Sequence, residues 1–426
     1  MFLASRPISP NPRLQFKSSK SGSQDGESES KAAPVETTPA DLVVVGSANV
    51  DIYIDVKDIP RKGETVDGSV TTVGPGGKGS NQAAAAAKAL QNTNKSVAFI
   101  GHLGSDAHAD MFLKAYSEIG VKSHLVDKLN QVPTGQAFII LDSQSENSII
   151  IALGANDVWG GSPSSFTDED FRALVKDPAS APCLSRAPLT LQQIKAVLNA
   201  SIVMLQREIP DDVNLFIAKL VHAAREANPS SNKLTMLDMG GRATPLPEEI
   251  LPYLSVLSLN ETELSRLTGI DVTIAPVDVD DIDESFHIAT HHMPIATDRI
   301  LQACAKLVQN GTRSIMITLG ANGALLVARR GDRLTSAASS VDEHNNGVTI
   351  LAYTPAFKPV PALKDTTGAG DCFRGNFAAA LLQGYNATDA LRFAAAASAI
   401  CVGTKGTLPS MPWGAETIRL MKEQRE

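Results

Sequence analysis

A run of apolar residues opens the part of the chain that the sequence predicts to be ordered: Asp41-Leu42-Val43-Val44-Val45-Gly46. An unbroken apolar strand, rather than an alternating one, is typical of a strand buried on both faces of a parallel sheet. Further apolar strands are expected at 96–101, 201–205, 234–237, 256–259, 314–319 and 324–327, and helices at 82–90, 106–119, 211–227, 373–382 and 390–402. This alternation predicts an α/β fold with a mostly parallel central sheet and helices on both faces.

A second, smaller sheet is expected within the same body. Short strands within residues 51–73 and 136–152 follow one another without helices between close neighbours, and a polar hairpin loop at 143–147 joins the last two. Three polar stretches rich in Gly, Pro and Ser are expected to be surface insertions: 156–188, 271–297 and 330–346.

The first forty residues differ in composition from the rest. No acidic residue occurs up to Lys20, while Ser, Pro, Arg and Lys are frequent. Such a start is typical of an organelle transit peptide, and a disordered tail without an address is the alternative. We therefore expect residues 1–40 to be separate from the folded domain at 41–426.

Composition bears on several classes of protein. No stretch approaches eighteen consecutive apolar residues, so no membrane-spanning helix is expected. The formal charge of −8 and an aromatic content of 5% argue against a nucleic-acid partner. Four scattered cysteines without a CxxC pattern indicate a reduced compartment rather than a disulfide framework or a structural zinc site.

The most informative motif is Lys364-Asp365-Thr366-Thr367-Gly368-Ala369-Gly370-Asp371, which leads into a predicted helix. Small residues at 368–370 let backbone amides converge at the helix N-terminus, where an anion such as a phosphoryl group is favoured. An acid at this place suits a general base that accepts a proton from an attacking hydroxyl. The simpler interpretation is that Asp371 only stabilises the helix dipole.

A second glycine cluster, Gly74-Pro75-Gly76-Gly77-Lys78-Gly79-Ser80-Asn81, precedes the predicted helix at 82–90. It matches GxGxxG, but a dinucleotide-binding loop would follow the first buried strand, which ends far upstream at Gly46. A Walker A loop also fails, because Lys78 is followed by Gly. The cluster therefore indicates close backbone approach to a small ligand, with Lys78 and Asn81 as donors.

Asn49 and Asp51 follow the first strand, at the sheet edge where open α/β folds bind ligands. Both side chains suit hydrogen bonds to vicinal hydroxyls. An Asx-type turn is the alternative for either residue alone.

Together these motifs resemble the ribokinase-like (PfkB-type) sugar kinases, most closely their plant-type ribokinase branch, from about Asp41 to Trp413. Asn260-Glu261-Thr262-Glu263 and Thr318-Leu319-Gly320-Ala321-Asn322-Gly323 match two further motifs of the family. The resemblance implies a three-layer α/β/α fold whose small sheet is a lid and a homodimer interface. It also implies ATP-dependent phosphorylation of D-ribose at O5, with Mg²⁺ required and K⁺ activating, and a plastid location; the cytoplasm is the alternative.

The resemblance assigns roles to individual residues. Asp371 matches the catalytic base, and Gly368, Ala369 and Gly370 match the anion hole. The positions that match ribose contacts are Asn49, Asp51, Gly77, Lys78, Asn81, Glu208 and Asp371. Those that match the nucleotide site are Asn260, Thr318, Gly320, Gly323 and Gly370, and Glu263 matches a magnesium ligand acting through water. Those that match the potassium loops are Asp365, Thr367, Cys401, Thr404, Gly406 and Ser410.

One stretch departs from the family pattern. Asp238-Met239-Gly240-Gly241-Arg242 stands where many bacterial ribokinases have Asn-Pro-Ala-Pro, so family contacts are not transferred to Asp238. Two alternatives to ribose phosphorylation stay open: a sister sugar or nucleoside kinase of the fructokinase or adenosine kinase type, and a non-catalytic regulator that binds a sugar or nucleotide.

Overall fold

The computed structural model describes residues 39–143, 147–272, 298–332, 334, 342–343 and 347–424. Residues 39–426 form one compact unit. The expected leader up to residue 38, the tip of the hairpin loop at 144–146, the stretch 273–297 and most of 330–346 lie outside the described residues.

The first predicted strand, β1 (Leu42–Val45), lies inside a large, mostly parallel sheet. Its strand order is β14-β15-β13-β12-β11-β10-β9-β1-β4-β5, with β6 beside β4. The run from β12 to β4 is parallel, whereas β13, β15 and β14 join antiparallel. The other strands are β4 (Val97–Gly104), β5 (Val121–Lys122), β6 (Val126–Leu129), β9 (Ile202–Gln206), β10 (Leu234–Asp238), β11 (Val256–Asn260), β12 (Ser314–Thr318), β13 (Ala324–Arg329), β14 (Asp342–Glu343) and β15 (Val348–Thr354).

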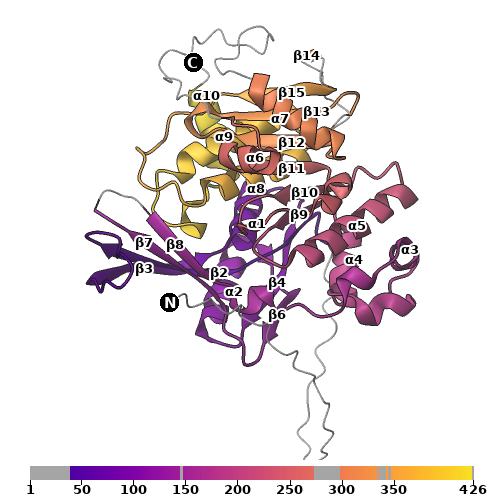
Figure 1. Cartoon of the computed structure of the whole chain (residues 1–426), viewed down its shortest axis with the longest axis horizontal. Helices are drawn as coiled ribbons and strands as arrows, with labels where there is room; N and C mark the ends of the chain where they lie inside the picture. Colours follow the sequence, from indigo (N-terminus) through magenta and orange to yellow (C-terminus); the bar gives the residue numbers. More distant parts are fainter. Residues whose placement is uncertain are drawn as a thin grey trace, which may run out of the picture. The chain divides into compact units, whose positions relative to one another are not determined.

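Helices cover both faces of this sheet. Successive residues of β1 accordingly pack in two different cores. Val43 and Val45 pack in one cluster, and Leu42 and Val44 in the other. Helices α3 (Asp168–Lys176), α4 (Leu191–Asn199), α5 (Asp211–Ala227), α6 (Glu261–Thr268) and α7 (Asp298–Gln309) contribute to the first core. Helices α1 (Lys78–Ala89), α2 (Ala107–Ile119), α8 (Ala369–Leu382) and α9 (Ala387–Cys401) contribute to the second, and α10 (Gly414–Glu423) packs on α9. The expected three-layer α/β/α fold is confirmed (Figure 1).

A separate four-stranded sheet has the order β3-β2-β7-β8. Its strands are β2 (Asn49–Val56), β3 (Gly68–Gly76), β7 (Gly135–Leu141) and β8 (Asn147–Ala152), and β2 pairs with β7 in parallel while the other pairs are antiparallel. In Figure 1 it extends from the body as the indigo and purple strands. We call this sheet the lid sheet. Strand β3 ends at Gly76, three residues beyond the expected limit at 73.

Several expectations are wrong in detail. The stretch 156–188 is not a surface insertion, because it contains α3, whose Phe171 and Leu174 are buried in the core beside α5. Helix α1 begins at Lys78 rather than at 82, so the second half of the glycine motif is its first turn. Within the described residues, no helix is long and apolar enough to cross a membrane.

Candidate active site

Asp371 lies in the first turn of α8 and is 4% exposed. Asn81 Nδ2, in the first turn of α1, donates to Asp371 Oδ2 at 2.9 Å, and Gln82 Nε2 donates to Oδ1 at 3.0 Å. Both carboxylate oxygens are thus fixed by side chains from a segment about 290 residues earlier in the chain. This arrangement brings the two glycine motifs together at one place.

The small residues before Asp371 form the start of α8. Gly368 has φ 78° and is the N-terminal cap, without a side chain that caps the helix. The amide of Ala369 donates to the Thr366 carbonyl at 3.2 Å. The other two predicted anion-hole amides, those of Gly368 and Gly370, have no acceptor among the described residues. Such free amides at a helix N-terminus suit an anion.

Glu208 joins several of the predicted sugar contacts. Its Oε2 accepts from Ser47 Oγ at 2.6 Å, from the Lys78 amide at 3.0 Å and from Asn49 Nδ2 at 3.2 Å. Burial raises the pKa of Glu208, and the positive charge of Lys78 opposes this rise. The carboxylate ties the end of β9 to the start of β2 and of α1.

Asn156 is a site residue that the sequence analysis missed. It is fully buried and donates through Nδ2 to Asn49 Oδ1 at 2.8 Å, and its Oδ1 accepts from the Ala48 amide at 2.9 Å. Its position in a stretch expected to be a surface insertion hid it, and only the tertiary contact with Asn49 reveals it.

Asp51 lies on the lid strand β2 and is 6% exposed. Thr407 Oγ1, from the loop after α9, donates to Asp51 Oδ2 at 3.0 Å. Burial raises the pKa of Asp51 to about 7, the hydrogen bond from Thr407 opposes this, and the charge of Glu208 adds to it. Asp51 therefore connects the lid sheet to the C-terminal loop.

The backbone at Gly77 requires glycine. Its φ is +87°, and a Cβ there would lie 2.5 Å from the Asn49 amide nitrogen. The helix α1 can therefore begin directly beside β2, with Lys78 as its first residue. The carboxylate of Asp371 is the largest cause that raises the pKa of Lys78, Asp238 and Glu208 add to it, and burial and the charge of Arg374 oppose it.

A buried polar network stands around Asp238, at the end of β10. Gln82 Nε2 donates to Asp238 Oδ2 at 2.9 Å, and Gln206 Nε2 fixes Gln82 by donating to its Oε1 at 2.8 Å. Arg374 Nε lies 3.2 Å from Asp238 Oδ1, and Lys78 Nζ lies 4.0 Å from Oδ2. The signals in the sequence were Gln82, directly after the glycine motif, and the departure from the family pattern at Asp238.

The predicted nucleotide residues lie at neighbouring strand ends. Asn260 ends β11 and is paired in register with Thr318, the last residue of β12. Asn260 caps α6: its Oδ1 accepts from the Glu263 amide at 2.8 Å, and Glu263 Oε2 accepts from the Asn260 amide at 3.0 Å. Gly320 and Gly323, with φ 53° and 90°, bound the turn after β12.

The two predicted potassium loops are brought together by Asp365. Its Oδ1 accepts from the Thr367 amide at 2.9 Å, and its Oδ2 accepts from the Gly406 amide at 3.0 Å. In the second loop Cys401 Sγ lies 3.1 Å from Ser410 Oγ, and the Thr404 amide donates to the Cys401 carbonyl at 3.1 Å. Over the described part of the chain, no group of three His, Cys, Asp or Glu side chains is placed to hold a metal.

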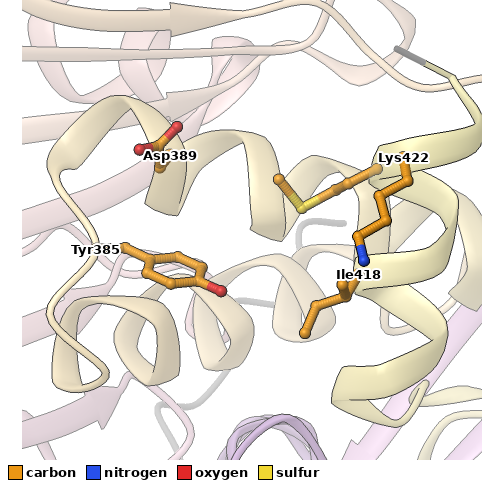
Figure 2. A pocket seen from close by; sticks show the side chains of 5 residues that line it. Tyr385, Asp389, Ile418 and Lys422 are labelled. Carbon is orange, nitrogen blue, oxygen red and sulfur yellow. The ribbon is translucent and has the colours of Figure 1, made fainter. Parts of the chain in front are cut away.

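A surface pocket lies at the other end of α8. Tyr385, Asp389, Ile418, Met421 and Lys422 line it, between the start of α9 and α10 (Figure 2). Because α8 rises about 1.5 Å per residue and ends at Leu382, its far end is about 16 Å from Asp371 along the helix. The pocket therefore takes no part in the site described above.

Comparisons with known proteins agree with this geometry. The model of the pfkB family of carbohydrate kinases matches residues 39–414. This chain belongs to that family. The kinase is 36% identical to a ribokinase of Arabidopsis thaliana over 89% of this chain and 81% of the relative. It is 29% identical to a ribokinase of Haemophilus influenzae, over 89% of this chain and 98% of the relative.

Solved structures give the same result. This kinase matches the structure of Arabidopsis thaliana ribokinase complexed with ribose and ATP at a TM-score of 0.66 and 34% identity, over 91% of this chain and 99% of that one. The expectations of the family, of the fold and of a carbohydrate kinase are confirmed.

Proposed function

We propose that this kinase transfers the γ-phosphoryl group of ATP to O5 of D-ribose. The observation that carries the proposal is the hydrogen bond from Asn81 to Asp371, because it joins the glycine turn of α8 to the cluster of Asn49, Lys78 and Glu208. The similarity to ribokinases, among them one complexed with ribose and ATP, supports ribose and ATP as substrates.

Asp371 acts as the general base in this proposal. Its carboxylate accepts the proton of the attacking hydroxyl as the bond from oxygen to phosphorus forms and the bond from phosphorus to the ADP oxygen breaks. The amides of Gly368 and Gly370 donate to the oxygens of the transferring group, and the N-terminal end of α8 favours their negative charge. Ala369 contributes the small side chain that keeps the turn open.

The sugar is held by side chains that are already oriented. Asn49 is fixed by Glu208 and Asn156, and Asp51 is fixed by Thr407, so both present set acceptors and donors to hydroxyl groups. Lys78, Asn81 and the Gly77 backbone complete the proposed pocket. A site that pairs hydroxyls discriminates strongly against sugars that lack them.

The residues present fit both proposed ions. Glu263 uses Oε2 for the α6 cap, which leaves Oε1 for a water of hydrated Mg²⁺, the usual mode for this ion. The oxygens of Asp365 each accept one amide and keep lone pairs for K⁺, together with Thr367 and carbonyls of Cys401, Thr404, Gly406 and Ser410. When bound, Mg²⁺ would neutralise phosphate charge beside Glu263, and K⁺ would fix the loops that Asp365 joins.

The test is an assay of the purified chain with ATP, Mg²⁺ and K⁺ against ribose, 2-deoxyribose, fructose and adenosine. We expect ribose to give the largest kcat/KM, with phosphate attached at O5 in the product's phosphorus NMR spectrum. A larger kcat/KM for fructose or adenosine would assign the chain to a sister kinase. Binding of ribose without turnover would indicate the non-catalytic regulator.

We also propose that residues 1–40 direct import into plastids. The acid-free start up to Lys20 and the similarity to a plant relative support this location. A fluorescent protein fused to residues 1–40 is expected in the plastids of leaf cells. Fluorescence confined to the cytosol would overturn the proposal.

A further inference from the structure

Arg374 is a buried arginine that no proposed step yet uses. It is 5% exposed, and its Nε donates to Ser258 Oγ at 2.7 Å and lies 3.2 Å from Asp238 Oδ1. Neither Nη1 nor Nη2 has a hydrogen-bond acceptor among the described residues. A guanidinium group has five N–H donors, so most of its donors at this buried place are left for another acceptor.

The free end of Arg374 lies over the first turn of α8. Residues 370 and 374 are one turn apart on the same helix face, and side chains in a helix lean toward its N-terminus. A Cβ on Gly370 would lie 2.5 Å from Arg374 Nη1. Glycine at this position therefore leaves the space in which the guanidinium extends to the predicted anion hole.

Neutralising Asp238 does not by itself account for this arginine. Asp238 already accepts from Gln82 Nε2 at 2.9 Å and from the Gly240 amide at 3.0 Å, and Lys78 Nζ lies 4.0 Å from it. Arg374 and Lys78 are also close enough to repel each other. Two cations that converge on a helix N-terminus are typical of a site for a multiply charged anion.

We propose that Arg374 is a further catalytic residue, which donates from Nη1 to an oxygen of the phosphoryl group while this group is transferred. The inference rests on the proposed function, because the anion is the γ-phosphoryl group of a nucleoside triphosphate. Asp238 and Ser258 hold Nε and so aim the planar group, and the amides of Gly368 and Gly370 are the other proposed donors to this phosphoryl group.

Arg374 neither gains nor loses a proton in this step. The phosphorus–oxygen bond to ADP breaks with its electron pair, the bond to the sugar oxygen forms, and the hydroxyl proton passes to Asp371. Arginine keeps its proton throughout and stabilises the negative charge spread over the transferring oxygens. Its contribution should thus be larger for the transition state than for bound ATP.

The experiment compares four forms of the full chain: wild type, Arg374→Met, Asp238→Asn and the double variant. Arg374→Met leaves Asp238 buried without its arginine and will lower the melting temperature, so turnover of this variant alone does not separate the two roles. The double variant removes both charges and is expected to regain thermal stability. The sugar used is the one with the largest kcat/KM in the substrate assay proposed above. The kcat ratios between variants can therefore be measured even if that sugar is not ribose.

We expect the double variant to remain about 10²–10³-fold slower in kcat than Asp238→Asn, the loss typical of one missing donor at a developing anion. Calorimetry supplies a second readout: both Arg374→Met forms should lose far more affinity for ADP with aluminium fluoride, a mimic of the transferring group, than for ADP alone. Arg374→Lys should recover only part of kcat, since lysine lacks the planar fork.

Equal kcat in the double variant and Asp238→Asn would overturn the inference and leave Arg374 as a counter-ion of Asp238. Equal losses of affinity for ADP and for ADP with aluminium fluoride would overturn it as well. Partial recovery of Arg374→Ala turnover by added guanidinium ion would support it.

Discussion

Asp371 is held by two amide side chains, from Asn81 and Gln82, and this fixes its direction before any substrate binds. We expect Asp371→Asn to keep ribose affinity and the fold but to lose turnover by about 10²–10⁴-fold, because asparagine cannot accept the hydroxyl proton. Stopped-flow turnover and calorimetric ribose binding on the same preparation check this. Turnover within a factor of two of wild type would mean that Asp371 is only a helix-capping acid.

Asp51 links protonation to stability near neutral pH. Its pKa is raised from 3.8 to about 7, so between these values the folded state keeps a proton that the unfolded state has lost. The contribution of Asp51 to stability is therefore fully present below about pH 4 and declines as the pH rises toward 7, by at most about 1.4 kcal/mol per pH unit.

Asp51→Asn removes this dependence. We expect the variant to gain stability relative to wild type between pH 5 and pH 8, as measured by urea unfolding at both values. A constant difference between the two proteins across that range would show that Asp51 titrates normally.

At the scale of the elements, α1 depends on the glycine turn that starts it. Gly77 and Gly63 have nearly the same φ, +87° and +89°, but a Cβ at 77 meets the Asn49 amide whereas a Cβ at 63 meets nothing within 4 Å. Gly63→Ala should thus lower the free energy of unfolding by only about 1 kcal/mol, the strain of a left-handed backbone in alanine. Gly77→Ala should cost about 3 kcal/mol and also weaken sugar binding, because the backbone must move.

Urea unfolding of both variants measures the two costs, and calorimetry with ribose measures binding. Equal costs would show that α1 and β2 can separate at this point without penalty. Such a result would mean that the contact of a Cβ at position 77 with the Asn49 amide does not require glycine there.

The two predicted potassium loops, which Asp365 joins, are the second feature at the scale of the elements. Thr367 and Gly406 donate to opposite oxygens of this carboxylate, so it sets the spacing beside the anion hole. With K⁺ bound there, exchange for Na⁺ should lower kcat by about tenfold, or about 1.4 kcal/mol, since a smaller ion draws the loops to another spacing. Asp365→Ala should abolish the difference between the salts.

Assays at matched ionic strength in potassium, sodium and tetramethylammonium chloride check the ion. Identical kcat in all three would exclude an activating cation in these loops. The melting temperature in each salt is the control for general effects on folding.

For the whole molecule, one face of the lid sheet is apolar and open. In register, Val73, Ile52, Phe138 and Ile150 form one row across its strands, and Val70 and Ile150 are 61% and 60% exposed. The opposite face carries the buried Tyr53 and Ile139. We propose that the open face forms a homodimer, since so much exposed apolar surface usually marks an interface.

Val70→Lys should shift the chain from dimer to monomer in sedimentation velocity, because a charge would be buried in an apolar contact. Ser69→Lys is the matched control: it lies on the other face of the same strand, opposite Asp55, and should remain dimeric. A monomeric wild type at micromolar concentration would contradict the proposal.

Local sequence determined most of the elements. Helix α5 spans 211–227, as its pattern predicts, and α2 is capped by Asp106 and Gly120, because capping depends on residues a few positions apart. The two glycine motifs likewise indicated Lys78, Asn81 and Asp371 without any structure. The same local rules missed α3, since its polar flanks resemble a loop and its burial depends on packing against α5.

Only the tertiary structure decided which side chains meet. Asn156 reaches Asn49 across 107 positions, and Gln82 reaches Asp371 across 289. Arg374 meets Asp238, the last residue of β10, and Ser258, in the middle of β11, only because α8 packs beside these strands. A hydrogen bond needs atoms within about 3 Å, a precision set by how helices pack on the sheet and not by residue type or spacing.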